Sequence, residues 1–301
     1  MTSTGPGLSV PDWPLSYGMF FPPMVGGVFY EHGHRMIAAM VGFLTLILAV
    51  WVVRSEQRKW VKVLAASALG AVILQGALGG ITVLFFLPDP VSIMHAVLAQ
   101  TFFVLTVVIA YSQSLERQNR VKDTRAPRIN FMFLKCVLVL TVLVYLQLIL
   151  GATMRHTDSG LAIPDFPTMG GYLIPPFNQD MLHAINSRRF DMDLPPVVLA
   201  QVIIHFLHRV FGFLIFLFAL AVSFTGFRSY SKDRQMLSVL YFLATIVVFQ
   251  ILLGISAVLS QKQPVLTSLH VVTGAVLLGV CVILFLRSAP LRLKDLLNER
   301  G

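Results

Sequence analysis

Seven long apolar runs, separated by polar segments, are the dominant pattern along this chain. Each run has about 20 residues or more, which is the length that an α-helix needs to cross the hydrocarbon core of a bilayer. The pattern therefore predicts an all-α polytopic membrane protein with seven transmembrane helices. The first helix is expected to extend outward to Val28, because nothing breaks the chain after Gly27. The runs cover residues 34–53, 61–87, 92–112, 131–153, 200–224, 236–260 and 267–287.

Composition supports the same class of protein. Hydrophobic residues make up 56% of the 301 residues, charged residues only 12%, and the mean hydropathy is +0.78. The net charge of +9 is also typical of nucleic-acid-binding proteins, but here the basic residues lie in short segments between apolar runs. We therefore expect membrane lipid and no nucleic acid as a partner. Cys136 and Cys281 both lie inside apolar runs, which argues against a disulfide framework or a zinc site.

Basic residues gather in alternate connecting segments. Those that follow the first, third, fifth and seventh runs are rich in Lys and Arg, whereas the segments around Asp89 and Lys262 are almost free of positive charge. The long connection 154–199 carries both signs, and long loops count less for orientation. Because cytoplasmic loops are enriched in Lys and Arg, we predict an outer N-terminal segment and a cytoplasmic C-terminus.

Four histidines occupy equivalent depths on runs that all pass from outside to inside. The interval to a basic residue beyond the run is 20 residues for His34 (54 − 34) and His208 (228 − 208), 22 for His95 (117 − 95) and 17 for His270 (287 − 270). At about 1.5 Å per residue, each lies roughly 26–33 Å from the cytoplasmic boundary, near the outer face. Ionisable side chains are rare and usually functional inside a bilayer. Since imidazole is a common axial ligand of haem iron, we interpret His34/His95 and His208/His270 as two haem-binding pairs.

The two halves of the chain repeat each other. A Pro-Asp-aromatic-Pro loop recurs at an offset of 153, a His-Arg pair at 174, and a Gln-x3-Gly motif followed by a histidine at 175. Repeats of this kind predict duplicated four-helix-bundle halves, here residues 1–125 and 126–301. The matched segments are 7–14 with 160–167, His34-Arg35 with His208-Arg209, Gln75-x3-Gly79 with Gln250-x3-Gly254, and His95 with His270.

One element of the repeat has no counterpart. The run at 131–153, which contains Gln147-x3-Gly151, precedes the second Pro-Asp-aromatic-Pro loop, and no equivalent run precedes Thr4. We therefore expect an eight-helix architecture of which seven helices are present. The helix missing from the first half would carry no paired histidine.

Several motifs together resemble the haem A synthase family of bacteria and mitochondria, over essentially the whole chain. They are Glu-x-x-His-Arg at residues 31–35, the Gly-Leu-Ser-x-Pro-Asp-Trp-Pro loop at 7–14, His208-Arg209, and the later histidines His95 and His270. Some members of that family carry a cysteine pair in the first outer loop. This chain has none there, so thiol chemistry in that loop is not open to it.

The resemblance implies an oxidoreductase that uses water to oxidise the C8 methyl of haem O to a formyl group. His208 and His270 would hold a haem b that carries the electrons away, His34 and His95 would hold the substrate, and Glu31 corresponds to the family's acidic residue. The family also implies a role in cytochrome oxidase assembly in the bacterial cytoplasmic membrane, with haem sites near the outer face. Haem O synthase and cytochrome oxidase assembly factors are the protein partners that it implies.

Other residues near these motifs have two interpretations each. Arg35 and Arg209 either bind haem propionates, which guanidinium matches well, or extend to lipid headgroups. Glu31 either takes part in the chemistry or caps the helix start and pairs with Arg35. The Gln-x3-Gly motifs are interpreted as helix-packing motifs, and Asp12 and Asp165 as organisers of turns.

The remaining histidines are not expected to bind iron. His205 aligns with Glu31 (205 − 31 = 174) and has either a structural role or a contact with the haem edge or water. His32 is expected at the membrane interface, and His156 and His183 in solvated loop positions. Two other functions also fit paired histidines: a di-haem cytochrome b that oxidises quinol, and a haem transporter or chaperone. Two equivalent histidine pairs without a nearby acid would favour electron transfer alone. An acid, Glu31, lies beside only one of the two pairs, and this favours catalysis at that pair.

Overall fold

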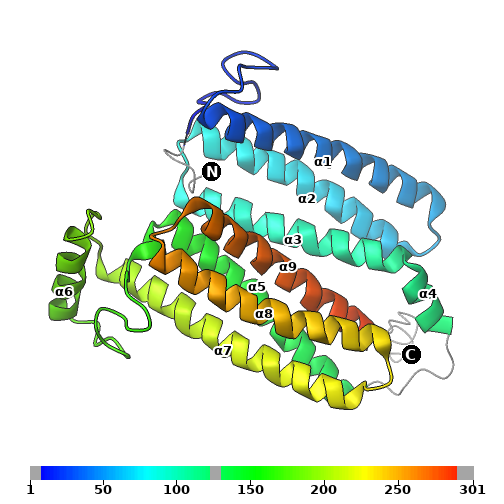
Figure 1. Ribbon diagram of the computed structural model, residues 1–301. Coiled ribbons are helices and arrows are strands. Elements are labelled where there is room, and N and C mark those ends of the chain that lie inside the picture. The colour runs from blue at the N-terminus through cyan, green and yellow to red at the C-terminus, as the bar shows by residue number, and fades with distance from the viewer. Residues whose placement is uncertain (1–7, 123–129, 290–301) are drawn as a thin grey trace.

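The protein is all-helical in the part of the chain that the structure describes, residues 8–122 and 130–289 (Figure 1). In this computed structural model, seven helices of the described part are long and apolar enough to cross a membrane, which confirms the seven predicted spans. The first begins at Gly27, as the sequence indicated. The spans are α1 (Gly27–Ser55), α2 (Lys59–Leu84), α3 (Asp89–Gln113), α5 (Phe131–His156), α7 (Leu199–Ser229), α8 (Arg234–Leu259) and α9 (Pro264–Ser288).

Polar side chains at the helix starts explain several of these bounds. The side chains of Asn130, Asp233 and Gln263 precede α5, α8 and α9 and accept hydrogen bonds from N–H groups in the first turn of each helix. These N–H groups have no partner within the helix, so such caps stabilise the helix start by about 1 kcal/mol. Pro264 at the first position of α9 needs no such partner, because it has no N–H.

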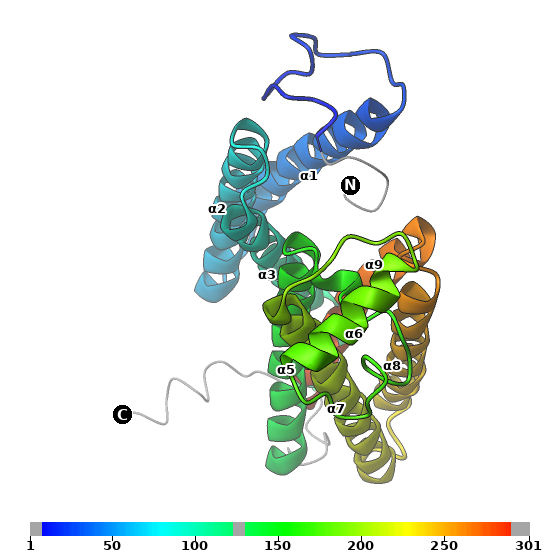
Figure 2. The same ribbon diagram turned by 90° about the vertical axis from the view of Figure 1, so that its left-hand side faces the viewer.

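Helices α5, α7, α8 and α9 form a closed four-helix bundle. Each packs against two neighbours in the order α5–α7–α8–α9–α5, and Figure 2 shows them grouped around a common centre. Leu140, Leu243, Leu278 and Leu284 lie fully buried in this core. Half of the residues in the most apolar stretch of α9 are buried, which makes α9 the most enclosed of the seven described spans.

Helices α1, α2 and α3 form a layer beside the bundle. Helix α1 packs on α2, α2 packs on α3, and α3 packs against both α5 and α9 (Figures 1 and 2). The hydroxyls of Thr101 and Tyr145 form a 2.7 Å hydrogen bond between α3 and α5. Met36, Met40 and Phe43 on α1 are exposed, which suits a helix face in contact with lipid. The expected boundary between the halves, at residue 125, lies outside the described residues.

The internal repeat is visible in the backbone of corresponding turns. Phe86 and Leu87 between α2 and α3 both have positive φ, and so do Gln261 and Lys262 at the same offset of 175 between α8 and α9. The two Pro-Asp-aromatic-Pro loops each contain one isolated β-bridge, Ser16 with Met19 and Met169 with Tyr172, at an offset of 153. The sequence repeat therefore corresponds to a repeat of local conformation in the described residues.

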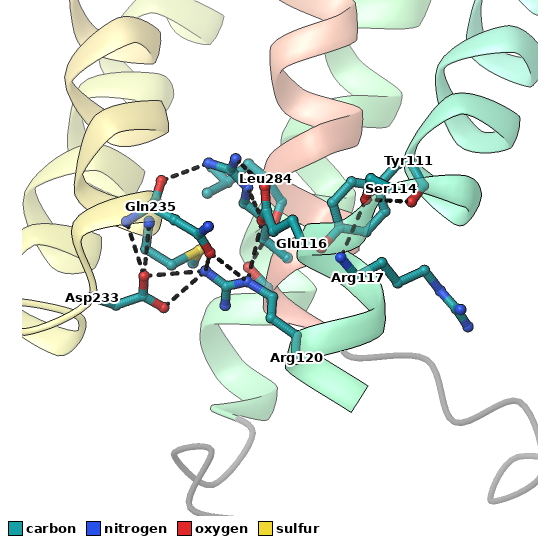
Figure 3. A network of polar contacts seen from close by, with 11 residues as sticks. Tyr111, Ser114, Glu116, Arg117, Arg120, Asp233, Gln235 and Leu284 are labelled. Carbon is teal, nitrogen blue, oxygen red and sulfur yellow. Dashed lines mark hydrogen bonds and ion pairs between the residues drawn. The ribbon is translucent and has the colours of Figure 1, made fainter. Parts of the chain in front are cut away.

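Two shorter helices were not predicted, α4 (Leu115–Lys122) and α6 (Gln179–Phe190). Helix α6 lies at the end where α7 begins (Figure 1), and α4 follows α3 at the opposite end. Figure 3 shows that Arg120 of α4 meets Asp233 at the start of α8, with which it forms a 3.0 Å ion pair. Glu116 of α4 accepts a hydrogen bond from Arg287 of α9 at 2.6 Å. This network ties the end of the first layer to the four-helix bundle.

Candidate functional site

The four predicted histidines lie near the same end of the molecule. Each follows the first residue of its helix by six to nine positions (34 − 27, 95 − 89, 208 − 199 and 270 − 264). Helices α1, α3, α7 and α9 all begin at the left of Figure 1 and run in the same direction. The common depth that the sequence predicted is therefore present in the arrangement of the helices.

His208 on α7 and His270 on α9 face each other across the bundle. Their ring centroids are 6.4 Å apart, and the ring planes meet at 71°. A metal–imidazole bond is about 2 Å long, so two such bonds plus the nitrogen-to-centroid distance of each ring match this separation. The geometry has room for one atom bonded to both rings. In the described residues no group of three or more His, Cys, Asp or Glu could hold a bare metal ion, but two axial ligands suffice for haem iron.

His34 and His95 form a less enclosed pair. They are close enough to interact electrostatically, yet His34 is exposed on α1 while His95 is partly buried on α3. The Nδ1 atom of His95 is buried without a hydrogen-bond partner, as is Nδ1 of His270. A buried polar atom without a partner costs free energy unless something absent from the protein alone satisfies it. Both pairs thus fit the imidazole donor set of a haem, and their role as ligands stays a prediction.

Three of the histidines each pack against a Gln-x3-Gly motif on the preceding membrane span, which is α2 for His95, α5 for His208 and α8 for His270. The amide nitrogens of Gln75, Gln147 and Gln250 donate to the backbone carbonyls of His95, His208 and His270, at 3.0, 2.9 and 2.9 Å. Our interpretation of these motifs as helix packing was incomplete, because in each case the residue packed against the motif is a candidate ligand.

The first Pro-Asp-aromatic-Pro loop, which precedes α1, is held by Arg35 and Glu31 of that helix. The guanidinium of Arg35 donates to the carbonyls of Val10, Asp12 and Leu15, and it forms a 3.0 Å ion pair with Glu31. The other carboxylate oxygen of Glu31 accepts from two loop N–H groups, at 2.8 and 3.1 Å. Glu31 is buried. Its ion pair with Arg35 confirms the pairing interpretation, whereas the N–H groups that it binds belong to Ser9 and Val10 of the loop, so it does not cap the start of α1. Its place in the chemistry, and the contact of Arg35 with propionates, stay predictions.

The second Pro-Asp-aromatic-Pro loop is held in the same way by Arg209 and His205 of α7. Arg209 donates to the carbonyls of Ile163 and Asp165 at 2.7 and 2.8 Å. The N–H of Ile163 and Nε of Arg209 each approach one ring nitrogen of His205 at 3.1 Å. A neutral imidazole has one acceptor nitrogen, so only one of these hydrogen bonds forms at a time. His205 is fully buried in this network, which is the structural role weighed for it.

Asp12 and Asp165 organise the turns of these loops, as predicted. Asp12 accepts from the N–H groups of Tyr17 and Gly18, and these hydrogen bonds lower the pKa of its carboxyl group. For Asp165, burial by itself raises the pKa. Hydrogen bonds from Thr168, Gly171 and Gly170 outweigh this effect, so its pKa lies below the ordinary value.

Three other histidines lie partly where the sequence placed them. His183 is exposed as expected, although on α6 rather than in a loop. His156 is the last residue of α5 and is half-buried, so the prediction of a solvated loop residue is wrong. His32 is buried, with Nδ1 2.8 Å from the hydroxyl of Ser16, and its place at the membrane interface stays a prediction. Its contact partner is in the loop before α1, which folds over the start of that helix and covers the ring.

The sequence matches a known protein family over most of its length. The model of the family described as COX15-CtaA, cytochrome oxidase assembly protein, matches residues 25–282. This range includes all four paired histidines and Glu31. It also includes the three Gln-x3-Gly motifs, whereas the loop before α1 lies outside the matched segment.

Several curated relatives share the name Heme A synthase. The relative from Symbiobacterium thermophilum is 35% identical over 171 residues, which is 55% of each chain. Those from Halalkalibacterium halodurans and Alkalihalophilus pseudofirmus are each 26% identical, over 294 and 269 residues. These two alignments cover 95% and 87% of this chain, and 89% and 80% of the relatives. The similarity therefore extends through both halves of the chain.

Proposed function

This chain belongs to the COX15-CtaA family of cytochrome oxidase assembly proteins, and from that premise we propose that it is an integral-membrane haem A synthase. The substrate would be haem O, whose C8 methyl group is oxidised to a formyl group with oxygen taken from water. The observation that carries the proposal is the pair of facing rings of His208 and His270, 6.4 Å apart inside the closed bundle.

Within this proposal the two histidine pairs have different tasks. His208 and His270 would hold a haem b, which supplies the chemistry of accepting and passing on single electrons when bound. His34 and His95 would hold the substrate near the outer face, with access from the lipid along α1. The tetrapyrrole itself supplies the reactivity, so the side chains contribute binding, orientation and electrostatics.

Glu31 is the proposed catalytic residue of the first pair. It lies one turn before His34, on the same side of α1. Its carboxylate forms an ion pair with Arg35 and accepts from two backbone N–H groups. In this proposal its role is electrostatic, stabilising positive charge that develops on the substrate carbon. The equivalent position of the second pair holds neutral His205, which argues against two equivalent electron-transfer sites.

The test compares Glu31→Gln with His205→Gln, the matched substitution in the other half. We expect Glu31→Gln to keep protein level and bound haem b while haem A formation stops and haem O or a hydroxylated product accumulates. His205→Gln should lower haem A output only in step with folded protein. Extracted haems are identified by mass in both variants. Normal haem A output from haem-replete Glu31→Gln protein would remove Glu31 from the mechanism. Absence of any haem O oxidation by the natural chain would refute the proposed function.

A further inference from the structure

Three histidines each pack against a glutamine and a glycine on a neighbouring antiparallel helix. A Cβ atom built at Gly79, Gly151 or Gly254 would lie 3.3, 3.2 or 3.1 Å from Cε1 of His95, His208 or His270, respectively. Such contacts are tighter than ordinary side-chain packing, so only glycine leaves each ring its observed place. The repetition at three separate helix crossings indicates a common arrangement rather than chance contact.

The glutamines are confined in return by the histidine-bearing helices. Four residues after His208 and His270 come Gly212 and Gly274, and a Cβ built there would lie 3.0 and 3.1 Å from Nε2 of Gln147 and Gln250. The third histidine, His95, is followed at the same spacing by small Ala99. At the crossings of His208 and His270, a histidine therefore lies over the glycine of one helix while a glutamine lies over the glycine of the other.

The hydrogen bond of each glutamine adds to this steric fit. A helical carbonyl already accepts from the N–H four residues on, so the carbonyl of His270 receives the amide of Gln250 as a second donor, at 2.9 Å. The amide is itself fixed, because the hydroxyl of Thr273 donates to its oxygen. At the other two crossings the glutamine nitrogen also lies 3.2 Å from Nδ1 of His208 and 3.3 Å from Nε2 of His95.

We propose that Gln75, Gln147 and Gln250, each with the glycine four residues later, are positioning residues that set the ring orientation of His95, His208 and His270 for axial ligation of a haem. The inference rests on the proposed function. Residues behind a metal ligand commonly fix its orientation, and their loss weakens binding by about 10- to 100-fold. Here the arrangement would fix both rings of the second pair before the haem arrives.

The experiment uses the purified full chain with its resident haem and three single variants. Gly254→Ala places a methyl group against the ring of His270, and Gln250→Met removes the donor while keeping side-chain length. Gly76→Ala is the matched control, because a Cβ there meets nothing within 4 Å. For each protein we measure haem per polypeptide, the electron paramagnetic resonance spectrum of the low-spin ferric haem, which depends on the angle between the axial rings, and thermal unfolding of haem-free protein.

We expect Gly254→Ala and Gln250→Met to shift the low-spin signal and to lower haem occupancy about 10-fold or more, with Gly76→Ala unchanged in both. Unshifted signals at full occupancy in the two variants would overturn the positioning role and leave the proposed function standing. Lowered unfolding temperatures with an unshifted signal from the remaining haem would also overturn it, in favour of simple helix packing. A natural chain that binds no bis-histidine haem would refute the proposed function and this inference together.

Discussion

The hydrogen-bond networks that hold the two Pro-Asp-aromatic-Pro loops share one arrangement and differ in residue type at one position. In both halves an arginine that directly follows a paired histidine donates to the carbonyls of a Pro-Asp-aromatic-Pro loop. One turn earlier the first half has Glu31 and the second has His205. A carboxylate accepts from the arginine and the loop together, whereas a neutral imidazole accepts only one of the two.

This difference distinguishes the residues that hold the loops from the residue proposed to take part in catalysis. Because Arg35 and Arg209 hold the loops in both halves, the loop fold alone does not require an anion at the position of Glu31. The first half nevertheless carries a negative charge beside its histidine pair, and the second does not. The helices that carry the two pairs also differ in burial. In the most apolar stretch of α9, half of the residues are buried, compared with 17% in that of α1. A resident cofactor suits the enclosed pair His208/His270, which has no carboxylate beside it. A reacting substrate suits the pair His34/His95, which has Glu31 beside it.

The largest effect is expected from substituting the paired histidines, because these substitutions remove the proposed iron ligands themselves. His208→Ala or His270→Ala should abolish the firmly bound haem b, since each leaves one axial position without a ligand. His34→Ala and His95→Ala should keep that haem and lose haem A formation. Visible absorption and haem content of the four purified variants distinguish the pairs. Unchanged low-spin absorption in both second-half variants would contradict the assignment.

A smaller effect is expected from Arg35→Met and Arg209→Met, which test the loop networks. Arg35→Met leaves the buried carboxylate of Glu31 without its ion pair, and breaking a buried pair on one side costs roughly 3–5 kcal/mol. Arg209→Met leaves loop carbonyls without donors next to a neutral ring, at about 1–3 kcal/mol for an unsatisfied buried group. Unfolding followed by temperature in detergent should rank Arg35→Met as the less stable. An Arg209→Met protein that is equally unstable would mean that Glu31 adds nothing to the first network.

The sequence was sufficient to predict the seven spans and the common depth of the histidines. Spans follow from apolar length alone, so Gly27–Ser55 and the six others were found with small errors at their ends. The depth follows from counting residues to a basic boundary. Helix α4 was missed because its contacts are with Asp233 and Arg287, far along the chain, and no local apolar period marks it.

The sequence singled out the four histidines that the structure brings to one end of the molecule. Their role as ligands stays a prediction, and the residues packed behind them were not predicted. The Gln-x3-Gly motifs were recognised, but spacing does not say which residue of an opposite helix a motif meets. A second signal was present, the small residue four positions after His95, His208 and His270. Read together, the two spacings on antiparallel helices indicate reciprocal packing. The roles of Arg35 and Arg209 as loop anchors needed the structure, because guanidinium suits a propionate as well as a row of carbonyls.

The smallest expected effect concerns the aspartates of the two turns, Asp165→Asn against Asp12→Asn. The pKa of Asp165 is lowered in the folded protein, so its ionised form contributes stability above the unfolded value of about 3.9, and that contribution is lost as the pH falls through the folded pKa. The natural chain should therefore exceed Asp165→Asn in unfolding temperature at pH 5–7, with the gap closing below about pH 4. Asp12 is less buried than Asp165 and lacks the equivalent of the Thr168 hydroxyl as a donor, so its variant should show a narrower gap with the same sign. Thermal unfolding across this pH range measures both gaps. A gap for Asp165→Asn that persists unchanged to pH 3 would mean that neutral hydrogen bonding, rather than the charge, holds the second turn.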